Sequence, residues 1–234
     1  MNRTICRHIP LVILLMLVMM ACGKNGSPKT EDSSGRPSAP ASPAPSAAAP
    51  ATAPDSGSSA RFIVKTPDDK RAVAVHIAGE NVKIEIGDGS AARVLRGSMR
   101  GTGKRKYEIE GGPLIAEVKA DNDAFKIRSA DGKLLWKVKL AADKIKISDN
   151  EENLNPYVLK LRDDGWKVEE NESSIGEVKF YADRGKIKVK DGGDAELFES
   201  NGDRPSAMYG VMLMKRIPET ERAIIMAELA ARGR

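Results

Sequence analysis

The chain has 234 residues, of which 38 are Lys or Arg and 33 are Asp or Glu, giving a formal net charge of +5 at pH 7. This weakly basic, mixed composition, with only 4% aromatic residues, excludes the basic footprint and stacking side chains of a nucleic-acid-binding protein. Two cysteines and two histidines leave few groups for nucleophilic, acid–base or metal chemistry. We therefore expect no cofactor, no metal ion and no catalytic residue.

A short apolar segment follows two arginines at the N-terminus. Arg3 and Arg7 precede the apolar run 9–21, which at about thirteen residues has the length of a signal-peptide core and is too short to span a membrane. The run ends in Val-Met-Met-Ala-Cys at 18–22, which resembles the lipobox of bacterial lipoproteins, with Met19 where Leu is usual.

The lipobox resemblance implies a lipid anchor. Residues 1–21 would be removed by cleavage between Ala21 and Cys22, and Cys22 would carry a diacylglycerol thioether and an N-acyl chain. Two or more acyl chains hold a protein stably in a bilayer. By the same resemblance, Gly23 favours the outer membrane, so we expect an envelope lipoprotein that faces the periplasm or the cell surface. A plain secretory signal is the alternative.

Residues 22–60 are rich in Pro, Ala and Ser and lack large apolar side chains. Such a segment cannot bury enough surface to offset its ordering entropy, so we expect a disordered tether that favours polyproline II. A proline-rich ligand for a partner protein is the alternative interpretation.

Residues 61–234 read as a single, mainly β domain. Many short runs alternate apolar and polar residues, as in Lys144-Ile145-Lys146-Ile147, which is typical of antiparallel strands with one wet face. Pairs such as Asp88-Gly89 and Asp131-Gly132 separate the runs at hairpin spacing. The expected strands are 62–65, 73–77, 82–86, 93–96, 106–110, 114–119, 125–128, 134–140, 144–148, 157–161, 166–169, 177–181, 186–190 and 195–199. We predict an antiparallel barrel or sandwich of repeated hairpin units.

An internal echo predicts tandem β-units over about 125–192. Segment 125–128 is similar to 159–162, 138–140 to 178–180, and 145–149 to 187–191, with an offset that grows only at loops. Shared strand alternation is the alternative explanation of this similarity.

The C-terminal region ends in an apolar helix. The run 207–214 is expected to be a last strand or a buried segment, and Pro218 opens a helix at about 218–232 with Gly233 as its C-terminal cap. Because AIIMAELAA is apolar around almost its whole circumference, the helix should pack inside or beneath the β layer. The arrangement resembles the tubby-like barrel shared with scramblase-like and LURP-type domains, which implies a possible fold and a disposition toward lipid headgroups.

The stretch 93–106 is the most basic part of the chain and contains three glycines. Its basic residues are Arg93, Arg96, Arg100, Lys104, Arg105 and Lys106. Arginines and lysines beside exposed backbone N–H groups can bind phosphate or carboxylate. The functional hypothesis is contact with an anionic envelope component, such as phospholipid headgroups, lipopolysaccharide phosphates or peptidoglycan carboxylates. A solvated hairpin or loop is the interpretation that we favour.

Other residues whose side chains could act in catalysis or bind a ligand are expected to be structural. His76 stands in an alternating run and should be a strand-face residue, while Trp136 and Trp166 should lie in the core or an interface. The acidic stretch 148–153 lacks the spacing of a calcium loop and should be a solvated hairpin turn.

These features favour a membrane-anchored lipoprotein with a non-catalytic domain that binds an envelope partner or scaffolds an assembly. The alternatives are a cryptic envelope hydrolase, which would need carboxylates gathered around His76, and a module that binds or handles anionic lipids.

Overall fold

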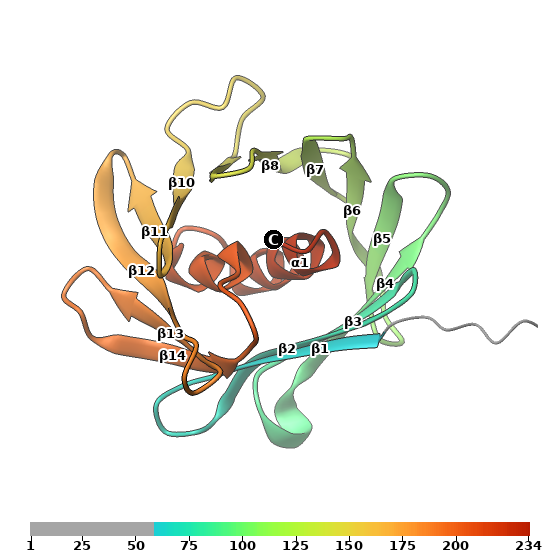
Figure 1. The fold of residues 1–234 in the computed structure, drawn as a ribbon. Helices are drawn as coiled ribbons and strands as arrows, with labels where there is room; N and C mark the ends of the chain where they lie inside the picture. Colours follow the sequence, from blue (N-terminus) through green and yellow to red (C-terminus); the bar gives the residue numbers. More distant parts are fainter. Residues whose placement is uncertain (1–58) are drawn as a thin grey trace, which may run out of the picture. The chain divides into compact units, whose positions relative to one another are not determined.

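The computed structural model describes residues 59–234, which form a closed antiparallel barrel around a C-terminal helical segment (Figure 1). Each strand pairs with its neighbours in the sequence, and β1 meets β14 to close the ring. The strands are β1 (Ser59–Lys65), β2 (Arg71–Ala78), β3 (Asn81–Ile86), β4 (Arg93–Met99), β5 (Lys104–Ile109), β6 (Leu114–Ala120), β7 (Ala124–Ser129), β8 (Leu134–Leu140), β9 (Lys144–Ser148), β10 (Tyr157–Arg162), β11 (Gly165–Glu170), β12 (Ser173–Tyr181), β13 (Lys186–Asp191) and β14 (Glu196–Asn201), with a short 3-10 helix, η1 (Gly89–Ala91), between β3 and β4.

The predicted mainly β fold is confirmed, and of the two predicted architectures the barrel is the one that forms. Each expected run overlaps one strand. Alternation places one face of each strand in the core, so Ile145 and Ile147 are fully buried, whereas Lys144 and Lys146 point outward. The first strand begins at Ser59 rather than at residue 62, because Ser59 pairs with Ala78, so the domain starts two residues before the predicted residue 61. The predicted signal peptide (1–21), Ala21, Cys22 and the tether up to residue 58 lie outside the described residues.

The regular unit of the barrel is a hairpin. Strands β6 and β8 start at Leu114 and Leu134, 20 residues apart (134 − 114), and share one burial pattern. The strands that follow them, β7 and β9, bury residues at equivalent positions: Phe125 and Ile127 on β7, and Ile145 and Ile147 on β9. The echo over 125–192 relates β7 to β10, β8 to β12 and β9 to β13, so no constant number of strands separates its matched segments.

The interior of the barrel is filled by the 3-10 helix η2 (Ala207–Leu213) and the helix α1 (Glu219–Ala231) (Figure 1). The apolar run 207–214 is thus a buried helical segment and not a strand. The predicted helix at 218–232 is confirmed within one residue at each end, and Gly233 adopts the expected left-handed conformation with φ 68°. Its N–H donates to Ala230 O at 3.0 Å, which satisfies a carbonyl at the helix end. No helix within residues 59–234 is long and apolar enough to cross a membrane.

Both ends of the described chain lie at one end of the barrel, which we call the terminal end. Ser59 starts β1 there and β14 finishes there, since the two strands are antiparallel. At this end the Ser206 hydroxyl donates to Arg234 O. The η2 helix runs away from the terminal end and α1 returns, with Arg216 at the opposite end, where its guanidinium lies 5.0 Å from the centre of the Tyr157 ring.

Candidate anion-binding surface

The outer wall of the barrel carries opposed lysines on seven consecutive strands, β5 to β11. At each of the six junctions between these strands, one lysine lies directly opposite another: Lys104–Lys119, Lys119–Lys126, Lys126–Lys137, Lys139–Lys146, Lys144–Lys160 and Lys160–Lys167. We call these nine lysines the lysine belt. Like charges directly opposite each other destabilise a sheet. The stability of the fold therefore does not explain the pattern.

The hairpin unit generates the central part of the belt. Lys126 and Lys146 occupy the same place in successive units, 20 residues apart, as do Lys119 and Lys139. Each is on the outer phase of a strand whose inner phase is fully buried. The rigid, filled barrel thus holds the ammonium groups on one continuous wall.

Carboxylates neutralise only part of the belt. Lys104 pairs with Glu117 at 2.8 Å, and the nearly buried Glu169 on β11 lies 2.5 Å from Lys160 and 3.2 Å from Lys167. The hydrogen bond from Lys160 holds the pKa of Glu169 below its usual value. The remaining lysines of the belt that form no ion pair with a carboxylate of residues 59–234 are Lys119, Lys139, Lys144 and Lys146.

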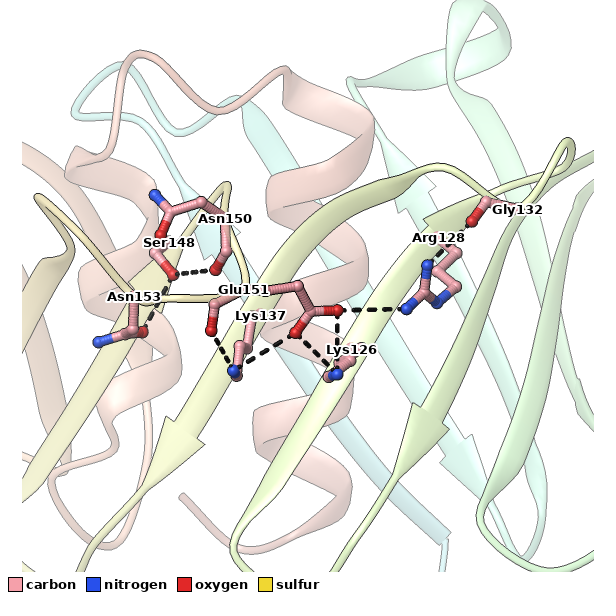
Figure 2. A network of polar contacts seen from close by, with 8 residues as sticks. All are labelled: Lys126, Arg128, Gly132, Lys137, Ser148, Asn150, Glu151 and Asn153. Carbon is pink, nitrogen blue, oxygen red and sulfur yellow. Dashed lines mark hydrogen bonds and ion pairs between the residues drawn. The ribbon is translucent and has the colours of Figure 1, made fainter. Parts of the chain in front are cut away.

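A loop-borne carboxylate covers the middle of the belt (Figure 2). Glu151, in the loop between β9 and β10, reaches over β7 and β8 and pairs with Lys126 at 2.8 Å, Arg128 at 3.3 Å and Lys137 at 3.4 Å. The hydrogen bond from Lys126 lowers the pKa of Glu151. The predicted solvated hairpin turn at 148–153 is confirmed, since it joins the antiparallel neighbours β9 and β10 and Glu151 is exposed. The sequence did not show that the sheet register places three cations beneath Glu151.

A hollow of about 580 Å³ adjoins the loop on the outside of β9, β10 and β11. Lys144, Lys146 and Lys160 line it together with Glu169 and Asn155. Its volume lies within the range of small-molecule sites. Glu172 also lines the hollow, so three cations and two carboxylates face a space that is large enough for a small anionic group.

The structure disperses the basic residues predicted to bind an anion. Arg93 lies near the end of the barrel opposite the terminal end and donates to Thr220 Oγ1 at 2.7 Å, and Arg96 donates from Nε to Glu110 at 2.9 Å. Arg100 is exposed in the turn between β4 and β5, and Lys106 points outward opposite Glu117. Of the six predicted residues, Lys104 alone belongs to the lysine belt.

Arg105 requires a correction, because it points into the barrel. It is 8% exposed, and its Nη1 lies 2.7 Å from Glu228 Oε1 on α1. The Tyr107 hydroxyl donates to the same oxygen at 2.7 Å, and Arg232 donates to the other one. Burial raises the pKa of Tyr107 well above its usual range. Arg105 shares the inward phase of Tyr107, so it cannot contact an external anion.

The histidine and tryptophans lie where expected. His76 is half-buried on the outer side of β2, burial lowers its pKa, and its Nε2 has no hydrogen-bond partner among residues 59–234. Trp136 and Trp166 are core residues, 8% and 5% exposed.

A hollow of about 870 Å³ lies on β10 to β13 and is lined by Asp163, Asp164 and Glu177 among others, so its carboxylates are not gathered around His76 on β2. In the described part of the chain, no group of three or more His, Cys, Asp or Glu is placed to hold a metal ion.

No protein family matches this chain, and neither a curated protein nor a solved structure matches it significantly. The resemblances to bacterial lipoproteins and to tubby-like barrels therefore stay predictions.

Proposed function

We propose that this chain is a lipid-anchored protein of the bacterial cell envelope whose barrel binds a flexible anionic polymer along the lysine belt, without catalysis. The observation that carries the proposal is the directly opposed pair of lysines at every junction from β5 to β11. Such pairs cost stability in the free protein. A polyanion that bridges them would offset this cost.

The shape of the belt favours a polymer over a flat membrane. Strands lie about 4.8 Å apart, so six junctions extend over an arc of about 29 Å on the convex barrel wall. A flat bilayer touches a convex wall along a narrow strip, whereas a flexible chain can follow the arc. Directly opposed lysines, whose Cβ atoms lie about 5 Å apart, suit a polymer that carries one anionic group per residue or two.

The predicted anchor supports the same interpretation. An acylated Cys22 and the Pro/Ala/Ser-rich tether would hold the barrel within reach of envelope polymers while leaving its wall free. A partner with phosphate or carboxylate groups then needs no specific pocket, since the charges of the belt act together.

The test uses the full-length protein reconstituted in phosphatidylcholine vesicles, with soluble polyphosphate as the probe. The double change Lys139→Gln and Lys146→Gln removes one opposed pair that has no carboxylate partner in residues 59–234. We expect weaker binding, and a slope of log K against log salt that falls by roughly one and a half. Unchanged affinity and slope would contradict the proposal.

The matched control is Lys179→Gln with Lys188→Gln. These lysines are also directly opposed, on β12 and β13, but they pair with Glu177 at 3.0 Å and Glu196 at 2.6 Å. The control should leave polyphosphate binding nearly unchanged. If phosphatidylglycerol added to the vesicles abolishes polyphosphate binding, the belt lies on the bilayer and the target is an anionic membrane instead.

A further inference from the structure

The ion pairs of Glu151 differ from the other ion pairs of the belt because a loop, and not a strand, supplies the carboxylate (Figure 2). The three cations lie on β7 and β8, whereas the carboxylate belongs to the loop between β9 and β10. By contrast, Glu169 is a strand residue of β11, two positions after Lys167 and next to β10, which carries Lys160, and it is almost buried. Glu169 is fixed by the sheet, and Glu151 is brought to the sheet by a loop.

The sheet sets the positions of the three cations. Lys126 lies directly opposite Lys137, and Arg128 is on the same strand as Lys126, with its Nη1 donating to Gly132 O at 3.0 Å. Strand register and this backbone bond hold the three groups together whether or not Glu151 is present. A site whose groups are preorganised does not need to be assembled when a ligand arrives.

The loop can leave without disturbing the sheet. It is closed on itself, since Ser148 Oγ donates to Asn153 Oδ1 at 3.0 Å and Leu154 N–H donates to Asn150 Oδ1 at 2.7 Å. Within the described residues, its polar contacts with β7 and β8 are those of the Glu151 side chain and carbonyl. The Glu151 side chain remains 43% exposed. The contacts of Glu151 therefore hold an already folded loop against β7 and β8.

A carboxylate satisfies the site incompletely. Three positive charges meet one negative charge, and Glu151 has two oxygens, so Lys126 shares Oε1 with Arg128 and Oε2 with Lys137, at distances up to 3.4 Å. A phosphate monoester carries close to two negative charges near neutral pH and presents three terminal oxygens. It can accept a separate bond from each cation.

We propose that Lys126, Arg128 and Lys137 form a binding site for a phosphate monoester group, and that Glu151 occupies this site until such a group displaces it. The inference rests on the proposed function, since it names the anionic group that the belt recognises and assigns to Glu151 the role of blocking the middle of the belt. An incoming phosphate would displace Glu151 and uncover Lys126 and Lys137, so that the lysines on β5 to β11 form one uninterrupted surface.

The test measures binding of inorganic phosphate by calorimetry at constant ionic strength, with the full-length protein in phosphatidylcholine vesicles. Glu151→Gln should bind phosphate at least tenfold more tightly than the unchanged protein. Glu152→Gln is the matched control, because Glu152 is exposed in the same loop and forms no ion pair within the described residues. This control should stay within twofold of the unchanged protein.

Two further measurements separate a site from a general charge effect. In the Glu151→Gln protein, dimethyl phosphate, with one negative charge, should bind at least tenfold more weakly than inorganic phosphate. Adding Lys137→Gln should remove the gain in phosphate affinity. The proposal is overturned if Glu151→Gln stays within threefold of the unchanged protein, or if the gain persists without Lys137.

Lipid and soluble sources of the phosphate group are distinguished in the same assay. If phosphatidic acid in the vesicles blocks inorganic phosphate, a lipid headgroup reaches the site; if binding is unchanged, the group is soluble or carried by a polymer. Both outcomes support the site.

The two proposals fail separately. If the change at Lys139 and Lys146 weakens polyphosphate binding but Glu151→Gln does not alter phosphate affinity, the lysine belt binds a polymer and the proposed displacement of Glu151 is wrong. If phosphate affinity responds to Glu151 but polyphosphate does not bind, the site stands and the proposed polymer is wrong.

Discussion

Arg105 and Glu228 form an ion pair of 2.7 Å inside the barrel, although 123 residues separate them in the sequence. The pair ties β5 to α1, and both side chains are almost fully buried, 10% and 1% exposed. A buried charge without its partner is strongly destabilising. The position of the central helix therefore depends on this contact.

Changing Glu228→Leu should lower the free energy of unfolding by about 3–5 kcal/mol, because Arg105 keeps its buried charge and loses its carboxylate. Urea denaturation followed by tryptophan fluorescence measures the loss. The double change Arg105→Phe with Glu228→Leu should recover most of it, since Phe125 fills the equivalent inward position of the next hairpin unit. A double variant as unstable as the sum of both single changes would contradict this account.

The lysine belt should cost stability in the absence of its partner. Lys139→Gln with Lys146→Gln should raise the free energy of unfolding by about 0.2–1 kcal/mol at low salt, because it removes a directly opposed pair of like charges. The gain should shrink in 0.5 M salt, where charges are screened. Urea titrations at both salt concentrations measure it. The pair Lys179→Gln and Lys188→Gln should show no gain, because the favourable ion pairs of these lysines with Glu177 and Glu196 are lost together with the repulsion between them. An equal gain there would refute the explanation.

Acid should weaken the barrel partly through Glu169, whose pKa is lowered by the hydrogen bond from Lys160. A carboxyl with a lowered pKa in the folded state stabilises the protein above its unfolded pKa, near 4.5, and this contribution is lost as the pH falls through the folded value. Glu169→Gln should thus reduce stability at pH 7. The difference from the unchanged protein should narrow steadily below about pH 4.5.

Urea midpoints between pH 7 and pH 3 measure this narrowing. Glu152→Gln makes the same charge change in the exposed loop and should follow the unchanged protein throughout. A constant difference between Glu169→Gln and the unchanged protein across the pH range would show that the hydrogen bond and not the charge matters.

The predicted anchor has its own test. Cys22→Ser should abolish acyl labelling with a radioactive fatty acid, because the thioether cannot form, and should release the protein from the membrane fraction. Labelling and membrane association that persist in this variant would rule out Cys22 as the anchor.

Sequence pattern predicted the strands and the C-terminal helix because their signals are local. Alternation and Asp-Gly turns identify strands, and Pro218 and Gly233 mark the helix ends. The choice between barrel and sandwich depends on whether β1 meets β14, a long-range contact that no local pattern encodes.

The candidate site was missed for a similar reason. Each lysine of the belt is an ordinary outward strand residue, and only the cross-strand register brings Lys126 opposite Lys137. The 20-residue spacing of Lys126 and Lys146 was a usable signal. The same spacing relates Arg105 to Phe125, which would have indicated that Arg105 points inward.

The closure of the barrel constrains when the protein can finish folding. The seam has one register pair, Lys65 with Glu199, and a bond of 2.6 Å from Ser200 Oγ to Ile63 O. The helix that fills the interior comes after both seam strands in the sequence. During synthesis the seam strands leave the ribosome before η2 and α1, so the interior of the barrel can be filled only after these two helices have emerged. The part of the core that is synthesised last is therefore the part that lies at its centre.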